Sequence, residues 1–258
     1  MWTRAMLKER AKVAFKRNYW SCVLVALILM IVTGGAASTA SSNAGRQMTE
    51  QAGITSQGNP AEDFINSLTA ASNDMGISVE AFVLIFMAIF SVAVIIVELL
   101  RIFVFSPMEI GGCRFFVENA NDTPGVGKIL YAFKSGAYGK MVLTLFLRDL
   151  FIALWSLLFV IPGIIKAYEY RMVPYLLADC PEMSRQDAFR ISKEMMTGQK
   201  WNAFVLDLSF IGWELLAGIT CGIAGIFYVA PYVYATDAEM FLVLRENYFQ
   251  SRNTQQVF

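Results

Sequence analysis

Charged side chains that could do chemistry occur inside or beside long apolar stretches of this sequence. Eight of them form the candidate binding site: Arg148, Asp149, Lys166, Glu169, Arg171, Asp207, Asp237 and Glu239. A bare charge at the centre of a lipid bilayer costs about 2.5–3.5 kcal/mol. We therefore expect most of these groups to be paired, protonated or hydrated inside a bundle of helices.

Four of the eight are expected at a similar depth. At about 1.5 Å per helical residue, Arg148 and Asp207 lie roughly 10–12 Å from the lysines that precede their helices. By the same rise, Arg171 and Asp237 lie roughly 12 Å from the charged residues that follow theirs. We predict that the four form one polar cluster in the cytoplasmic half of the molecule. Three roles stay open: an ion-pair layer that fixes helix packing, a hydrated cavity that binds a polar head group or peptide, and a proton relay.

Other kinds of chemistry find no support in the residue types present. Histidine is absent, which removes the commonest metal ligand and the commonest general base. The cysteines are isolated and form no CxxC pair; they are Cys22, Cys113, Cys180 and Cys221. Basic and acidic residues are equal at 21 each, so no net charge favours nucleic acid. We expect no metal, no cofactor and no nucleic-acid partner.

The elements that must position these charges are membrane helices. Hydrophobic residues make up 56% of the 258 residues and charged ones 16%, which is too apolar for an ordinary soluble domain. Six apolar stretches predict an all-α, polytopic bundle in one membrane domain: 22–32, 79–105, 141–161, 162–178, about 202–222, and 223–244. Lysine and arginine in the intervening loops place both termini in the cytoplasm of a plasma-membrane protein.

Three further segments complete the predicted layout. Residues 1–19 predict a basic amphipathic helix at the membrane surface, although a cleaved signal peptide is the alternative for this end. Residues 38–78 are polar and contain no lysine, which is typical of an extracytoplasmic loop. Residues 179–200 predict a cytoplasmic amphipathic helix that begins at Ser184, with Asp187 in the capping-box position.

Several segments resemble a known family. They are YRMVPYLLAD (170–179), DAFRISKEMM (187–196), YVAPYVYAT (228–236) and the basic start MWTRAMLKERAKVAFKRNYW. The chain resembles the bacterial integral-membrane family catalogued as domain of unknown function 975. That family is similar in layout to the membrane domain attached to some glycerophosphodiester phosphodiesterases. The resemblance supports six membrane spans and assigns no catalytic or binding residue.

The expected function is therefore that of a non-enzymatic accessory or binding component in envelope or export processes. Its surroundings are the lipid bilayer, and a partner membrane subunit or a second copy of the chain is a candidate partner. A transporter of small molecules, lipids or peptides is the alternative, with oligomerisation supplying additional spans. An intramembrane lipid enzyme is the third reading, in which Asp207 and Asp237 would act as acid and base.

Overall fold

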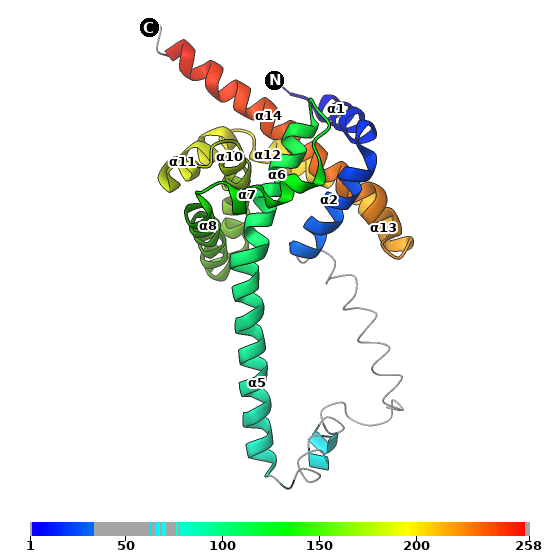
Figure 1. Cartoon of the computed structure of the whole chain (residues 1–258), viewed down its shortest axis with the longest axis vertical. Helices are drawn as coiled ribbons and strands as arrows, with labels where there is room; N and C mark the ends of the chain where they lie inside the picture. The colour runs from blue at the N-terminus through cyan, green and yellow to red at the C-terminus, as the bar shows by residue number, and fades with distance from the viewer. Residues whose placement is uncertain are drawn as a thin grey trace. The chain divides into compact units, whose positions relative to one another are not determined.

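The computed structural model describes residues 2–33 and 78–255, together with residues 62, 65–67, 69, 70 and 76. Every regular element in this described part of the chain is helical, which confirms the all-helical prediction (Figure 1). The chain divides into two units, one of Met1–Thr39 with Ile102–Phe258 and one of Ala40–Arg101. The first unit holds all eight residues of the candidate site.

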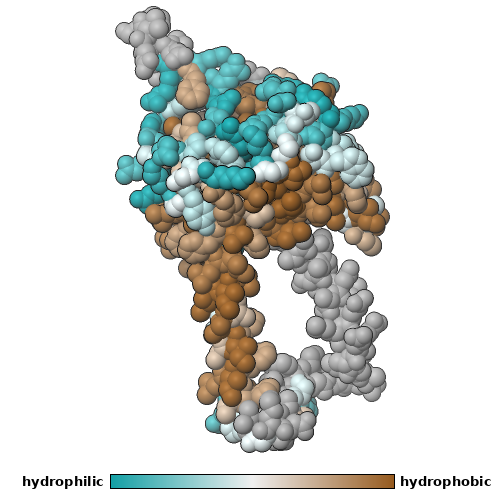
Figure 2. Space-filling model, in the orientation of Figure 1, coloured by the Kyte–Doolittle hydropathy of each residue, from teal (hydrophilic) through white to brown (hydrophobic). Residues whose placement is uncertain are grey.

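The second unit contains one long apolar helix, α5 (Val79–Leu100). Ser78 begins it, because its hydroxyl accepts a hydrogen bond from the backbone N–H of Ala81. None of the α5 side chains is buried, and Figure 2 shows hydrophobic colouring along the helix. Its 22 residues reach about 33 Å, which matches the apolar thickness of a bilayer. Most of the predicted loop 38–78 lies outside the described residues.

The first unit is built from short helices around two longer ones. In chain order they are α1 (Arg4–Arg17), α2 (Tyr19–Val32), α6 (Ser106–Asn119), the 3-10 helix η2 (Val126–Leu130), α7 (Tyr131–Lys134), α8 (Tyr138–Leu158), α9 (Val160–Glu169), α10 (Val173–Asp179), α11 (Arg185–Met196), α12 (Lys200–Leu208), α13 (Ile211–Ile219), the π-helix η3 (Gly225–Val229) and α14 (Ala230–Gln255). The π-helix η1 (Arg101–Phe105) leads into α6. Helix α14 packs against α1, α2, α6 and α11, and α6 also packs against α10.

Two glycines allow the close packing of α6. A Cβ atom at Gly111 would overlap the backbone carbonyl of Ile129 in η2. A Cβ atom at Gly112 would lie 2.5 Å from the side chain of Leu29 in α2. Because real Cβ atoms need more space than this, only glycine lets α6 approach both neighbours.

Two of the predicted spans are interrupted. The stretch 162–178 is divided into α9 and α10 by a turn at residues 170–172. Pro174 stands in the first turn of α10, where its missing N–H and its effect on the preceding residue favour a new helix start. The stretch 202–222 is divided into α12 and α13 by a turn at residues 209–210.

By length and composition, three helical stretches of the described chain could cross a membrane: Val79–Asn119, Tyr138–Leu158 and Lys200–Ile219. A fourth is added if the bent pair α1 and α2 counts as one span. Helix α9 has ten residues, which reach only about 15 Å. The six-span count therefore stays a prediction, while several apolar helices support a membrane location.

The surface of the first unit separates by polarity. Hydrophilic residues gather at the end that carries α1 and the C-terminal part of α14, and hydrophobic residues cover the surface beside them (Figure 2). The hairpin of α8 and α9 contributes strongly exposed apolar side chains, such as Leu157 and Ile161. A contiguous apolar surface of this kind suits contact with lipid better than contact with water.

Two amphipathic helices lie on the polar side. Helix α1 begins at Thr3, and its axis bends by 107° into the apolar helix α2. Helix α11 begins at Ser184, whose hydroxyl accepts a hydrogen bond from the backbone N–H of Asp187, as the capping pattern predicts. Hydrogen bonds from the guanidinium of Arg190 and the hydroxyl of Ser184 hold the pKa of the Asp187 carboxyl below its usual value.

Candidate binding site

Arg171 lies in the turn between α9 and α10 and joins three parts of the fold. Its guanidinium donates to both carboxylate oxygens of Asp207 on α12, at 2.7 and 2.9 Å. It also donates to the carboxylate of Asp237 on α14, at 2.7 Å. The hydroxyl of Tyr168 donates to Asp207 at 2.7 Å. Such two-oxygen contacts between a guanidinium and a carboxylate are among the strongest hydrogen bonds in proteins.

Arg148 on α8 forms a second network. It donates to both carboxylate oxygens of Glu109 on α6, at 2.8 and 3.1 Å, and to the neighbouring Asp149 at 2.8 Å. The Arg148 side chain is only 12% exposed. These contacts join α8 to α6 through Arg148 and Glu109, which are 39 residues apart in the sequence.

A cavity of about 150 Å³ connects the two networks. Its wall contains Leu29, Thr33, Glu109, Cys113, Phe116, Arg171, Pro174, Tyr175, Tyr234 and Asp237. Glu109 belongs to the network of Arg148, and Arg171 and Asp237 belong to the other. The structure thus brings three of the four residues at similar depth, Arg171, Asp207 and Asp237, into direct contact. Arg148 reaches the same cavity only through Glu109.

The two networks together contain more negative than positive charge. They hold two guanidinium groups and four carboxylates, so the net charge is −2 if all six groups are ionised. Asp149 and Asp207 have side chains about one-third exposed, and solvent can stabilise part of this charge. Glu109 and Asp237 are more buried and face the cavity.

The other predicted residues lie in two separate ion-pair groups. Glu169 accepts from Lys166 at 2.6 Å and from Lys200 at 2.5 Å, which links α9 to the start of α12. Glu239, whose side chain is 3% exposed, pairs with Arg10 of α1 at 2.8 Å. The eight predicted residues are therefore distributed over four ion-pair groups rather than one.

Glu109 is the residue that the predicted set lacks. It lies two residues after Pro107 in an apolar stretch, so its charge and position were a usable signal. Tyr168 is a second residue that the predicted set lacks. Its position in the sequence does not indicate its contact with Asp207. Within the described residues, no group of three or more His, Cys, Asp or Glu side chains is arranged to hold a metal ion.

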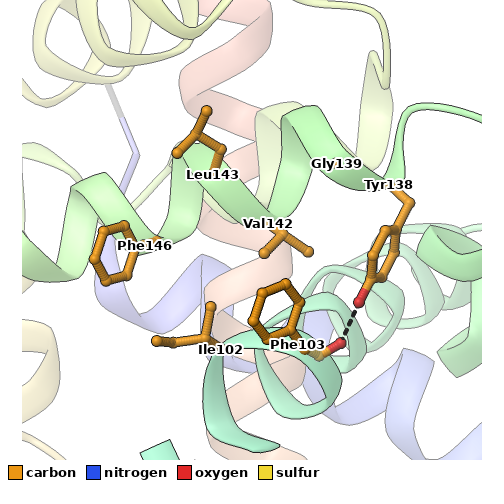
Figure 3. Close-up of a pocket in the computed structure, with 7 residues that line it drawn as sticks. All are labelled: Ile102, Phe103, Tyr138, Gly139, Val142, Leu143 and Phe146. Atoms are coloured by element: carbon orange, nitrogen blue, oxygen red, sulfur yellow. Dashed lines mark hydrogen bonds between the residues drawn. The ribbon is translucent and has the colours of Figure 1, made fainter. Parts of the chain in front are cut away.

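A larger cavity of about 310 Å³ lies between η1 and α8 (Figure 3). Its lining residues are Ile102, Phe103, Tyr138, Gly139, Val142, Leu143 and Phe146. Tyr138 alone among them has a polar side chain, and its hydroxyl donates to the backbone carbonyl of Phe103 at 2.5 Å. This cavity offers no further side-chain polar group that could orient a ligand, so we place the candidate site at the smaller, charged one.

The fold and the charged cavity together define an all-helical membrane-type protein with ion pairs between its helices. Residues 157–247 match the model of the family described as Protein of unknown function (DUF975). This match confirms the resemblance for the segments 170–179, 187–196 and 228–236, whereas the basic start of the chain lies outside it. The matched stretch contains Arg171, Asp207 and Asp237, but neither Arg148 nor Glu109. No curated protein and no solved structure matches the chain, and the likeness to the phosphodiesterase membrane domain receives no support.

Proposed function

We propose that the chain is a multi-pass protein of the bacterial plasma membrane that binds a small polar ligand in the cavity between Glu109, Arg171 and Asp237. It would act without catalysis, as a binding or accessory component in envelope or export processes. The observation that carries this proposal is a cavity whose wall contains charged side chains from α6, from α14 and from the turn between α9 and α10. Apolar packing between membrane helices needs no such cavity.

The charge balance favours a ligand with a positive group. A purely structural ion-pair layer needs equal positive and negative charge, because an unpaired charge in a low-dielectric region is unfavourable. The two networks instead carry two carboxylates in excess. An ammonium or guanidinium group in the cavity would balance one of the two, and solvent reaches the partly exposed Asp149 and Asp207. The volume of about 150 Å³ is large enough for such a group with some water.

Native mass spectrometry of protein purified in mild detergent tests this proposal. The wild-type chain should retain a small cationic molecule, and Glu109→Gln or Asp237→Asn should each reduce its occupancy about ten-fold or more, because a charged contact is lost. Asp179→Asn is the matched control, since it removes a carboxylate that pairs with Arg245 away from the cavity. Equal retention in all four proteins, or no bound molecule in any, would contradict the proposal.

A transporter is the second candidate, and the helix interruptions favour it. Arg171 lies within the turn between α9 and α10, and Asp207 lies two residues before the turn between α12 and α13. Transporters commonly bind substrate where membrane helices are discontinuous, because freed backbone groups are tolerated only beside a cavity. The molecule identified by mass spectrometry would then be taken up by vesicles that contain the protein, whereas an accessory protein would only bind it.

A further inference from the structure

Helix α1 has one face packed against the fold and another that is exposed. Leu7, Ala11, Ala14 and Phe15 are buried, and α14 is its main neighbour. The exposed surface includes Arg4, Lys12 and Lys16, with only Glu9 as an acidic residue on the helix. The packing explains why α1 is a stable helix, and it also places the ammonium of Lys12 over the ring of Tyr232. It does not explain the excess of positive charge.

Most of the positive charge of α1 is not balanced by carboxylates. The helix has six basic residues: Arg4, Lys8, Arg10, Lys12, Lys16 and Arg17. Lys8 and Arg17 donate to neutral backbone carbonyls, of Ser209 for Lys8 and of Asn119 and Asp122 for Arg17. Arg10 alone pairs with a carboxylate within the described residues, that of Glu239. Six positive charges against Glu9 and Glu239 leave a surplus of four.

Exposed apolar groups accompany this charge. Val13 is 67% exposed on α1, and Trp20 is 69% exposed at the start of α2. Because α1 turns by 107° into the apolar α2, an α2 directed along the bilayer normal would place α1 nearly parallel to the bilayer surface. Tryptophan and basic side chains both favour the level of the lipid head groups.

We propose that α1 and the first turn of α2 form a binding surface for phospholipids with an anionic head group. Arg4, Lys12 and Lys16 contact the phosphates, while Val13 and Trp20 contact the adjoining acyl region. This surface is separate from the charged cavity, so it stands whether or not the cavity binds a ligand. It gives the protein a preference among the lipids around it.

Fluorescence of Trp20 tests this surface directly. A chain with Trp2, Trp155, Trp201 and Trp213 replaced by Phe retains Trp20 as its only tryptophan, which can be excited at wavelengths where tyrosine does not absorb. In bilayers that mix brominated and ordinary lipids, brominated phosphatidylglycerol should quench the fluorescence of Trp20 roughly three-fold more than brominated phosphatidylcholine does. The preference should weaken as ionic strength rises and fall close to one in the variant R4Q/K12Q/K16Q.

A matched variant separates this surface from a general effect of charge. The variant K134Q/R185Q/K193Q removes the same charge from exposed positions of α7 and α11 and should keep the preference at Trp20. Because Trp2 is buried, the chain with all its tryptophans is also compared by native mass spectrometry of retained lipids, where the same pattern is expected. Equal quenching by both lipids in bilayers, or equal loss in both variants, would overturn the proposal. The proposal would also be overturned if an acidic protein bound the wild-type chain and not R4Q/K12Q/K16Q, while the lipid preference of the two was the same.

Discussion

Arg171 shows how one side chain can join helices that are distant in the sequence. Its partners Asp207 and Asp237 lie 36 and 66 residues further along the chain. The guanidinium is planar and has several donors, so it serves both carboxylates at once, which a lysine could not do with the same geometry. Asp207 also accepts from Tyr168, so its removal would leave a second polar group without its partner.

At this scale we predict that Arg171→Met destabilises the protein by roughly 3 kcal/mol, because two partly buried carboxylates lose their counter-ion. Combining it with Asp207→Asn and Asp237→Asn should restore much of the loss, because neutral amides need no counter-ion. Thermal unfolding in mild detergent measures both effects.

Arg245→Met is the control for this prediction. Arg245 pairs with Asp179 in a position where both side chains are about one-third exposed, so its loss should cost less than about 1 kcal/mol. If Arg171→Met cost no more than Arg245→Met, the network around Arg171 would not stabilise helix packing.

Among the elements, α6 packs closely against several neighbours, including α2, α10, α14 and η2. Gly111 and Gly112 remove side-chain volume on two sides, and Ile110, Phe115 and Phe116 fill the space between α6 and the adjoining helices. The position of α6 matters for the site, because it carries Glu109 into the cavity wall. The packing of this helix and the placement of that carboxylate are therefore coupled.

We predict that Gly111→Ala destabilises the protein by about 1–3 kcal/mol, the usual cost of overfilling a packed core. The atom in the way is the backbone carbonyl of Ile129, which cannot move as a flexible side chain can. Chemical or thermal unfolding in detergent measures the change. Gly139→Ala on α8 is the control, because no atom lies within 4 Å of its added methyl group, and it should be neutral or slightly stabilising. A neutral Gly111→Ala would show that α6 and η2 are further apart than described.

The interruptions in α9–α10 and α12–α13 connect this scale to the site. A continuous helix through residue 171 would direct its side chain according to a single helical periodicity. The turn at residues 170–172 releases Arg171 from that periodicity and lets it reach Asp207 and Asp237. The break in the helix therefore determines where Arg171 lies, whether the protein binds a ligand, transports one or uses the ion pairs only for stability.

For the whole molecule, the division between polar and apolar surface supports insertion into a bilayer, and the orientation of the chain is the remaining prediction. We predict that a cysteine at Gln57 reacts with an impermeant thiol reagent in intact cells and that one at Gln186 does not. The basis is the distribution of lysine and arginine, which are concentrated in the loops assigned to the cytoplasm. Labelling is measured by the mass shift of the purified protein.

The native cysteines provide the control for this experiment. Cys180 and Cys221 are exposed and must be replaced before the new cysteines are introduced. Chains that keep only one of them add a second test, because Cys221 should be labelled and Cys180 protected in the predicted orientation. Labelling at both Gln57 and Gln186, or at neither in intact cells while both react after lysis, would contradict the six-span layout.

The sequence by itself determined the helical class, the apolar character and the helix start at Ser184. These are local properties: hydrophobicity accumulates along a stretch, and the cap at Ser184 depends on a residue three positions away. The resemblance to the matched family could also be recognised from the sequence, because it lies in contiguous segments: residues 170–179, 187–196 and 228–236.

The tertiary structure alone decided which charges that are distant in the sequence meet. Sequence spacing gave Arg148 and Arg171 similar depths, but depth along a helix does not specify the rotation of that helix or its neighbour. Packing paired Arg148 with Glu109 and directed Glu239 to Arg10 of α1. It also interrupted the helix at Arg171, which placed the guanidinium between two carboxylates. Such contacts join residues dozens of positions apart, and they form only where close-packed helices bring them within hydrogen-bond distance.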